Sequence, residues 1–193
     1  MTRPEFVAGV IAAGEGSRLA RHAPLVKPLI PVAGRPLAHW VVDGLKIAGA
    51  RRVTVLTNSR GGDVPPSLSA AFPGLPFDFT TADTASSFES FRLVARRLAR
   101  DADSFLISTV DALITPSEVA RFLAECRAAR ADAGLALTRF VDDEKPLWAD
   151  VGQDGLVTAV GDRARSLGAV TCGLYYLTAA TAALLPEAGA HAR

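Results

Sequence analysis

The stretch that decides the fold runs from Phe6 to Leu19 and reads FVAGVIAAGEGSRL. Its first part, Phe6 to Ala13, is continuously apolar, which is typical of a strand buried on both faces of a parallel sheet. The segment Gly14-Glu15-Gly16-Ser17 then breaks the run. Glycines at this point let backbone N–H groups approach an anion closely, and Arg18 adds a planar fork suited to phosphate oxygens. The stretch therefore predicts a buried first strand followed by an anion-binding loop.

Taken alone, the glycines of this loop allow other interpretations. A dinucleotide fingerprint needs a third glycine where the chain has Leu19, and the spacing GxxxxGK of a Walker loop does not occur here. A plain turn between a strand and a helix stays open. The next segment of the chain decides between that turn and a phosphate site.

That segment is a lysine within a proline-rich run, from Lys27 to Leu37, reading KPLIPVAGRPL. Three prolines in this run restrict the backbone, since each fixes its own φ and disfavours a helical conformation for the residue before it. We therefore expect the run to be extended and stiff, and Lys27 to have a fixed direction.

The rest of the chain alternates strand and helix up to about residue 140. Helical spacing is present in 37–48, 88–98 and 115–126, and apolar strand-like runs in 53–57, 77–80, 105–110 and 134–140. Residues 58–74 are rich in Gly, Pro and Ser and predict a loop or a poorly formed helix. Short strands at 147–151, 156–160 and 169–177 and a helix-like end at 178–185 complete the pattern. The expected fold is α/β, a Rossmann-like three-layer α/β/α domain with a mostly parallel sheet and a small mixed or antiparallel extension.

Composition narrows the function classes. The chain has 193 residues, 49% hydrophobic and 21% charged, with a net charge of +1. This balance suits one folded domain spanning 1–193 and gives no reason to expect a nucleic-acid or membrane partner. Two cysteines, Cys126 and Cys172, without CxxC spacing suit buried thiols in a reducing compartment, so we expect a cytoplasmic protein. No internal repeat or linker marks a second domain.

Taken together, AAGEGSRL, KPLIPVAGRPL and a helix that ends at Ala48-Gly49 resemble the N-terminal signature of the sugar-phosphate nucleotidyltransferase-like superfamily. The resemblance extends from Phe6 to about Leu177 and is strongest up to Thr57. It implies an enzyme that joins a nucleoside triphosphate to a small phosphorylated molecule and releases pyrophosphate. It implies Mg²⁺ as the cofactor, and a homo-oligomer is possible.

The resemblance also implies roles for the residues of these motifs. The triphosphate loop would comprise Gly14, Glu15, Gly16, Ser17 and Arg18, with Arg18 on the phosphates. Lys27 would reach toward the α-phosphate, so Arg18 and Lys27 are the predicted catalytic residues. The backbone of Ala12 and Ala13 would face the base.

Asp111 follows the apolar run Phe105–Val110, so its carboxylate should emerge at the carboxyl edge of the sheet, where α/β proteins bind ligands. A turn or capping aspartate is the alternative from the sequence alone. In the resembled family a magnesium ligand stands at this place, which makes Asp111 the candidate metal ligand, and Mg²⁺ is often held by one or two carboxylates plus phosphates and waters.

The nucleotide base and the acceptor are less well defined. The Ser/Thr-rich run 81–91 resembles the branch that makes CDP-alcohols, such as the inositol-1-phosphate and phosphocholine cytidylyltransferases, and so favours CTP; a polar helix cap is the alternative. For the acceptor we expect Asp150, Arg163 and Gly173, with a charged surface loop as the alternative for Asp150. The lysine that many members carry after the Asp154-Gly155 turn is replaced here by Gly161-Asp162-Arg163.

The C-terminal part departs from the family, because no further carboxylate that would complete metal binding is recognisable after Leu177. Either the domain lacks its usual C-terminal end, or the second metal contact comes from elsewhere, or catalysis is weak or absent. Two alternatives to the transferase remain: a non-catalytic nucleotide-binding or regulatory domain of the same fold, and an enzyme like the molybdenum-cofactor guanylyltransferases.

Overall fold

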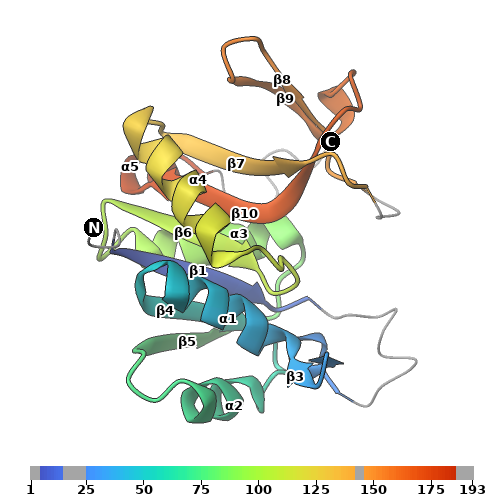
Figure 1. Ribbon diagram of the computed structural model, residues 1–193. Coiled ribbons are helices and arrows are strands. Elements are labelled where there is room, and N and C mark those ends of the chain that lie inside the picture. The colour runs from blue at the N-terminus through green and yellow to red at the C-terminus, as the bar shows by residue number, and fades with distance from the viewer. Residues whose placement is uncertain (1–4, 15–24, 142–145, 186–193) are drawn as a thin grey trace.

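The computed structural model describes residues 5–14, 25–141 and 146–185. A six-stranded sheet forms its centre (Figure 1). In spatial order the strands are β5 (Phe77–Thr81), β4 (Ala50–Thr57), β1 (Phe6–Ala12), β6 (Ser104–Thr109), β10 (Val170–Thr178) and β7 (Ala133–Thr138). The pairs β5–β4, β4–β1 and β1–β6 are parallel, whereas β10 runs antiparallel to both β6 and β7. The expected mostly parallel α/β sheet is confirmed.

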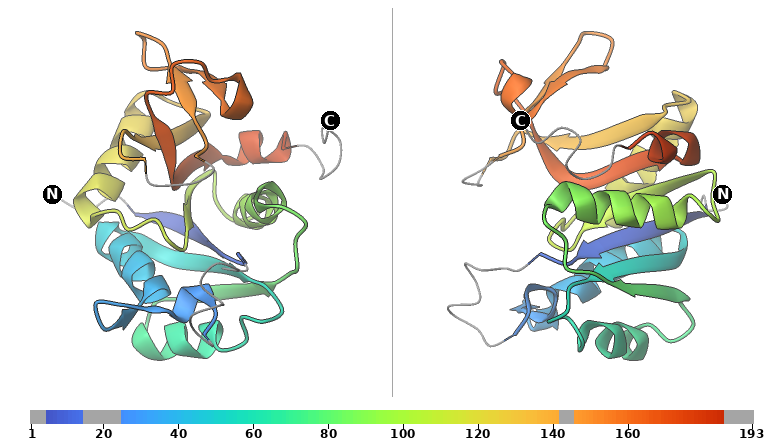
Figure 2. Two further views of the ribbon diagram at one scale, coloured as in Figure 1. Left: turned by 90° about the vertical axis from the view of Figure 1, so that its right-hand side faces the viewer. Right: turned by 180° about the vertical axis from the view of Figure 1, so that it is seen from behind.

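Helices cover both faces of this sheet (Figure 2). The helices are α1 (Leu37–Ala48), α2 (Val64–Ala71), α3 (Ser87–Leu98), α4 (Pro116–Ala128) and α5 (Ala179–Ala183). Buried residues of α1, α2 and α4 belong to one apolar cluster, and those of α3 and α5 belong to another. The two clusters lie on opposite faces of the sheet, which gives the three expected layers.

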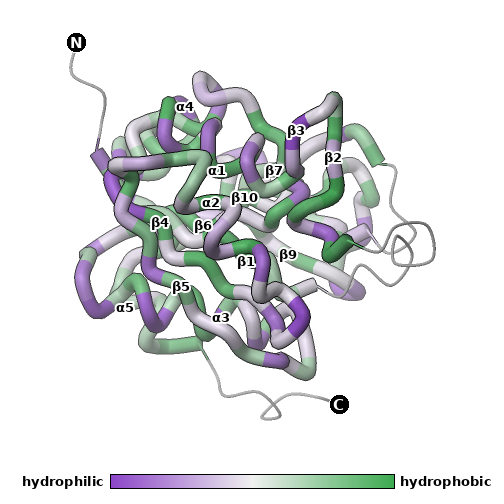
Figure 3. Tube along the Cα trace, turned by 90° about the horizontal axis from the view of Figure 1, so that it is seen from below, coloured by the Kyte–Doolittle hydropathy of each residue, from purple (hydrophilic) through white to green (hydrophobic). Residues whose placement is uncertain are grey.

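The strands in the middle of the sheet are hydrophobic, as expected for strands that helices cover on both faces. Seven of its side chains have no exposed surface at all: Ala8, Val10, Val53, Val55, Phe105, Leu106 and Ile107. Figure 3 shows green, hydrophobic stretches along the strands in the middle of the molecule and purple segments mainly around its outside. Gly9 allows α3 to approach β1 closely, since a Cβ at this position would overlap Val94.

Two helix starts follow directly from the sequence. Thr115 accepts a hydrogen bond from the backbone N–H of Glu118 at the start of α4, and Ser86 does the same for Glu89 at the start of α3. These are N-caps, which satisfy backbone donors that the first helical turn leaves free. The expected helix start at Thr115 is confirmed, and Pro116 lies in the first turn as expected.

The structure differs from the sequence expectation in the second half of the chain. The strand expected at 169–177 as part of the extension is β10, a nine-residue strand inserted in the central sheet between β6 and β7. Its residues Leu174, Tyr176 and Leu177 are buried, which explains this central place. Only β8 (Ala149–Val151) and β9 (Val157–Val160) form the separate extension, a hairpin that stands away from the sheet in Figure 1.

In the region 58–74, where a loop or poor helix was expected, α2 forms a regular helix with Pro65 and Pro66 in its first turn. Prolines are compatible with a first turn because its N–H groups have no partner within the helix. No helix in residues 5–14, 25–141 or 146–185 is long and apolar enough to cross a membrane.

Candidate nucleotide site

The candidate site lies at the carboxyl edge of the sheet, between β1 and β6. Strands that follow β1 in the chain, β4 and β5, lie on one side of it, and β6 lies on the other. In α/β sheets a crevice opens where the strand order reverses in this way, and ligands bind there. Ala12 ends β1 at this edge, Ala13 follows it, and Gly14 begins the loop that leaves the sheet.

Most of that loop lies outside the described residues. Glu15, Gly16, Ser17 and Arg18 belong to the undescribed segment 15–24. Their roles in binding triphosphate, and the catalytic role of Arg18, stay predictions. Ala12 and Ala13 are both buried, so their backbones rather than their side chains are what a ligand at this edge could meet.

Lys27 and Asp111 meet at this edge. The Nζ of Lys27 donates to Oδ2 of Asp111 at a distance of 2.5 Å, although 84 positions separate them in the chain. The side chain of Lys27 is 25% exposed and that of Asp111 is 49% exposed, so the pair is open to solvent and to a ligand. The structure thus brings together two of the residues that the sequence singled out separately.

The ionised state of Asp111 is favoured by its surroundings. Burial acts to raise the pKa of this carboxyl, but hydrogen bonds from the side chains of Lys27 and Thr109, together with the charge of Lys27, outweigh it. The net result is a pKa below the ordinary value for aspartate. Asp111 is therefore a carboxylate at neutral pH, which a metal ligand has to be.

The backbone around Lys27 is not extended, and here the sequence expectation is wrong. Lys27–Leu29 form a 3-10 turn, closed by a bond from Ile30 N to Lys27 O. A small hairpin follows, with β2 (Pro31–Val32) paired to β3 (Arg35–Pro36). Proline fixes φ near −65°, a value that suits a helical turn as well as an extended chain. Ala33 and Gly34 close the hairpin at positive φ, and this turn folds the run back on itself.

The start of α1 braces this hairpin. The indole N–H of Trp40 donates to the carbonyl of Val32 at 2.9 Å, and the guanidinium of Arg35 lies 4.9 Å from the Trp40 ring. Arg35 also pairs with Asp43 at 3.0 Å. These contacts hold the hairpin that follows Lys27 against α1, and sequence reasoning did not foresee them. A fixed direction of Lys27 itself stays a prediction. Arg35 and Trp40 stand five positions apart across the start of α1, a spacing that carries no recognisable motif.

The expected acceptor residues come from three elements: Asp150 from β8, Arg163 from the turn after β9, and Gly173 from β10. Asp150 in β8 uses both carboxylate oxygens to hold a neighbouring turn, accepting from Arg165 N at 2.7 Å and Ser166 N at 2.9 Å. Hydrogen bonds from the side chain and backbone of Ser166 and from Arg165 hold its pKa below the ordinary value. Arg163 lies exposed in the 3-10 turn Gly161–Arg163 after β9. Acceptor binding by these two residues stays a prediction.

Gly173 has a packing role that explains why it is glycine. It lies in β10 with φ of +83°, where the register with β7 shifts, and a Cβ there would overlap the Oγ1 of Thr109. Thr109 ends β6 two residues before Asp111. Gly173 therefore allows β10 to lie closely against the strand end that carries Asp111, and its contact with an acceptor remains a prediction.

Asn58 is a residue of this edge that sequence reasoning missed. It follows β4 directly, is 9% exposed, and donates from Nδ2 to the carbonyl of Ala13 at 2.9 Å. A signal was present in the sequence, because Asn58 is the single asparagine of the chain and comes directly after a β-rich run.

The Ser/Thr-rich run that favoured CTP contains the cap of α3. Ser86 caps the helix, the backbone N–H of Ala85 donates to the Glu89 carboxylate, and Thr84 Oγ1 lies 2.6 Å from Ser90 Oγ. The capping alternative is thus confirmed for this run. That finding leaves a contact between the run and a base as a prediction.

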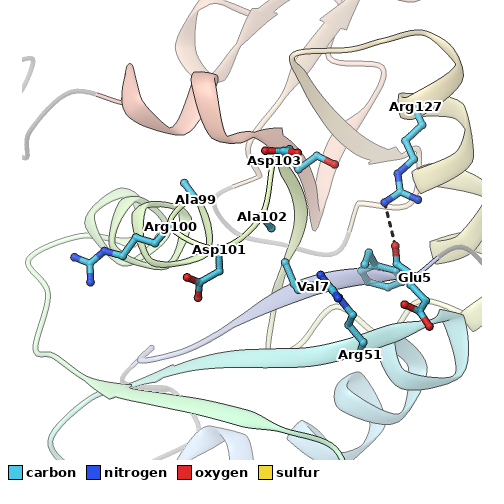
Figure 4. Close-up of a pocket in the computed structure, with 11 residues that line it drawn as sticks. Glu5, Val7, Arg51, Ala99, Arg100, Asp101, Ala102, Asp103 and Arg127 are labelled. Atoms are coloured by element: carbon cyan, nitrogen blue, oxygen red, sulfur yellow. Dashed lines mark hydrogen bonds between the residues drawn. The ribbon is translucent and has the colours of Figure 1, made fainter.

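A hollow of about 450 Å³ lies at the opposite edge of the sheet, where the strands begin (Figure 4). Arginine and acidic side chains line it in equal number: Arg51, Arg100, Arg127, Glu5, Asp101 and Asp103. Arg127 donates to the carbonyl of Glu5 across it, as the dashed line shows. This hollow contains none of the residues that the sequence predicted for the site.

The three-layer α/β fold, with a lysine–aspartate pair at the switch point of its sheet, defines the protein as an α/β domain of the doubly wound class. Comparison with known proteins specifies the family. Residues 8–171 match the MobA-like NTP transferase domain, and the chain belongs to this family. The resemblance to nucleotidyltransferases that the N-terminal motifs indicated is confirmed.

The individual relatives have low sequence identity to this chain. The bifunctional protein GlmU of Anaeromyxobacter dehalogenans is 28% identical over 189 residues, which cover 92% of this chain and 38% of GlmU. The 2-C-methyl-D-erythritol 4-phosphate cytidylyltransferase of Nocardia farcinica is 34% identical over 160 residues, covering 82% of this chain and 65% of that protein. The chain thus spans well under half the length of GlmU.

Among solved structures, the inositol-1-phosphate CTP transferase from T. maritima has the same fold. Its TM-score is 0.76 at 18% identity, with 93% of this chain and 73% of that chain covered. This confirms the fold class that the sequence predicted.

Proposed function

We propose that this chain is a nucleotidyltransferase domain that joins a nucleoside triphosphate to a small phosphorylated molecule and releases pyrophosphate. The observation that carries the proposal is the pairing of Lys27 with Asp111 at the switch point, next to the strand end that leads into Gly14. Both charges stand where a triphosphate would meet the sheet edge, and the chain belongs to a family of NTP transferase domains.

The main task in this reaction is to neutralise charge, because an acceptor phosphate must attack the α-phosphorus of another anion. The backbone N–H groups of 14–18 would hold the triphosphate, with Arg18 on its oxygens and the backbone of Ala12 and Ala13 near the base. Lys27 would turn from Asp111 to the α-phosphate, where negative charge accumulates as the bond forms. No side-chain nucleophile is required, since a phosphate monoester is itself nucleophilic.

Asp111 fits the metal that the family implies. Its carboxylate is half exposed, is kept ionised by its surroundings, and already has a cationic group, the Lys27 ammonium, at hydrogen-bonding distance. Mg²⁺ bound at Asp111 would supply positive charge between the carboxylate and the phosphates. Lys27 holds the carboxylate in place at the sheet edge until then.

The proposal also covers the nucleotide base and the acceptor, for which fewer observations are at hand. CTP is favoured by the likeness of run 81–91 to the CDP-alcohol branch, and a relative at 34% identity is named a cytidylyltransferase. GTP is the alternative that a likeness to the molybdenum-cofactor guanylyltransferases would imply. On the acceptor side, Arg163 is exposed and cationic and would bind a phosphate, while Asp150 and Gly173 shape the neighbouring backbone.

A pyrophosphate-release assay tests the proposed function. Each of the four nucleoside triphosphates is combined with pooled sugar phosphates and alcohol phosphates in the presence of Mg²⁺. We expect release with one triphosphate and one pool, and loss of release when EDTA removes the metal. The Lys27→Ala variant serves as the control for contaminating activity, because a contaminant would be unaffected by it.

A second candidate function is a non-catalytic nucleotide-binding domain. The Lys27–Asp111 pair favours it, because a carboxylate neutralised by lysine has a partner without a metal. Calorimetry separates the two functions. Nucleotide binding without pyrophosphate release from any pool would support the binding domain, and release would exclude it.

A further inference from the structure

Asn58 lies where β4 leaves the sheet, next to the end of β1. Ala12 and Thr57 are partners in the parallel register of β1 and β4, so Ala13 and Asn58 are the first residues beyond the last pair. Past this point, backbone hydrogen bonds between β1 and β4 no longer hold the two segments together. The Nδ2 of Asn58 replaces the missing ladder bond by donating to the carbonyl of Ala13 at 2.9 Å.

The amide of Asn58 is fixed at both ends. The side-chain Oδ1 accepts from the backbone N–H of Arg60 at 3.1 Å. The backbone carbonyl of Asn58 accepts from Gly61 N at 3.0 Å. An amide offers an N–H donor on one side and a C=O acceptor on the other, and here each is used. The residue as a whole is 9% exposed, so water competes little for these bonds.

The turn that carries Asn58 is tied from the other side as well. Ser59 N donates to the carboxylate of Asp83 at 2.9 Å, and Ala82 N donates to the carbonyl of Thr57 at 2.9 Å. These bonds attach the end of β4 to the segment that follows β5. Asn58 thus reaches β1 from a turn that is itself held in place.

We propose that Asn58 is a positioning residue that fixes the carbonyl of Ala13 and so sets the direction in which the chain enters the triphosphate loop. The residue after Ala13 is Gly14, whose backbone has the widest conformational freedom. Without the bond from Asn58, nothing in the side chain at position 14 would restrict that direction. This inference rests on the proposed function, since it assigns Asn58 to the loop that would hold the triphosphate.

The chemistry of the site explains why asparagine is required. Alanine would leave the buried carbonyl of Ala13 without its partner, which is costly in the interior. Aspartate has the same shape but, when ionised, places an acceptor against an acceptor. Only the protonated form of a carboxyl could donate to Ala13 as the amide does.

The first measurement uses the fact that the chain contains one asparagine. Protein labelled with ¹⁵N in asparagine alone shows one side-chain NH₂ group by NMR. We expect its two protons to differ, with the proton bonded to Ala13 exchanging with D₂O about tenfold or more slowly than the other, since exchange requires the bond to open. Two protons that exchange equally, at the rate of a free amide, would overturn the inference before any ligand is added.

The second measurement uses Asn58→Asp and calorimetric titration with CTP, or with whichever of the four triphosphates binds the wild type. At pH 8 we expect affinity about tenfold or more below that of the wild type, the scale of one lost hydrogen bond in a buried site. At pH 5 the variant should approach the wild type, because burial raises the pKa of the introduced carboxyl and its protonated form donates to Ala13.

Controls separate positioning from general destabilisation. Arg60 and Asp83 are charged residues next to Asn58, and their charges could change nucleotide affinity with pH. The affinity of Asn58→Asp is therefore compared with that of the wild type at the same pH, so that this effect is common to both proteins. Ser67→Ala removes a bond of 2.9 Å between Ser67 and His39 on the outer helices and should lower the melting temperature without changing nucleotide affinity.

A deficit of Asn58→Asp that is the same at pH 5 and pH 8 would contradict the inference. If no triphosphate binds the wild type, the proposed function fails; the labelled amide then still shows whether the bond to Ala13 exists, and the positioning role is overturned with the function.

Discussion

Lys27 and Asp111 are 2.5 Å apart in space and 84 positions apart in the chain. Each is an ordinary residue in isolation, a lysine next to proline and an aspartate after a strand. We propose that their proximity at the switch point gives both a function, because a cation and a carboxylate are the groups that a triphosphate with Mg²⁺ requires. Both side chains are partly exposed, so their pairing contributes little to folding, up to about 1 kcal/mol.

Lys27→Ala should lower kcat about a hundredfold while changing KM little. The lysine is expected to act on charge that develops in the transition state, and removing one such electrostatic stabiliser costs about 10²–10³ in kcat. Steady-state kinetics of pyrophosphate release measures both constants. The matched control is Lys46→Ala, since Lys46 lies in the last turn of α1, over the ring of Phe72. A raised KM with unchanged kcat would make Lys27 a binding residue only.

Asp111→Asn should abolish magnesium-dependent turnover and leave the melting temperature nearly unchanged. The amide keeps the size of the side chain but cannot supply the negative charge that binds Mg²⁺. Calorimetry gives a second readout: Mg²⁺ should no longer strengthen binding of the triphosphate.

The matched control for this variant is Asp101→Asn at the opposite edge of the sheet. Asp101 pairs with Arg52 at 2.9 Å and its side chain is 52% exposed, close to the 49% of Asp111. It should retain wild-type turnover. Wild-type activity of Asp111→Asn at limiting Mg²⁺ would return Asp111 to the role of a turn residue.

At the scale of elements, β10 depends on a glycine. Gly173→Ala should destabilise the protein by about 2–5 kcal/mol, from a positive φ at about 1–2 kcal/mol and from overlap with Thr109 at about 1–3 kcal/mol. Urea unfolding measures the loss. Gly155→Ala isolates the first contribution, since Gly155 has φ of +80° and a Cβ there would meet nothing within 4 Å, and it should cost only about 1–2 kcal/mol. Equal losses in the two variants would show that the contact with Thr109 is unimportant.

An ion pair links α3 to β5. Arg97 donates to both carboxylate oxygens of Asp78, at 2.6 and 3.0 Å. The hydrogen bond from Arg97 is the main cause that holds the pKa of Asp78 below its ordinary value. A depressed carboxyl pKa adds stability above the ordinary value of about 4, and this contribution is lost as the pH falls through the pKa of the folded state.

Asp78→Asn should therefore reduce the free energy of unfolding by about 1 kcal/mol at pH 7, the upper end for a partly exposed pair with two bonds. The difference from the wild type should shrink steadily as the pH is lowered below about 4. Urea unfolding of both proteins across this range measures it. A difference that does not vary with pH would show that the pair with Arg97 is not its cause.

At the scale of the molecule, one sheet joins the beginning and the end of the described chain. β1 begins at Phe6 and β10 ends at Thr178, yet only β6 lies between them. We therefore propose that the chain is a single domain and expect one cooperative unfolding transition. Calorimetry combined with circular dichroism tests this, with coincident transitions as the expected result. Two separated transitions would divide the chain into independent units.

The sequence by itself determined most of the helices and strands and indicated the family. Continuous apolar runs gave the buried strands, helical spacing gave α1, α3 and α4, and Thr115 with Glu118 marked a helix start, because these features depend on neighbours within a few positions. The motifs from Gly14 to Leu37 indicated the family because they too are patterns of residues close together in the sequence. Lys27 and Asp111 could be proposed, since each stands beside a recognisable local pattern.

Only the tertiary structure decided what lies beside what. That Lys27 binds Asp111, that Asn58 holds Ala13, and that Gly173 must lack a side chain next to Thr109 all depend on segments brought together by the sheet. The same holds for β10, whose central place follows from burial on both faces and not from its own short pattern. Local sequence fixes backbone preferences and periodicity, whereas contacts between distant segments arise when the apolar faces of those elements pack together.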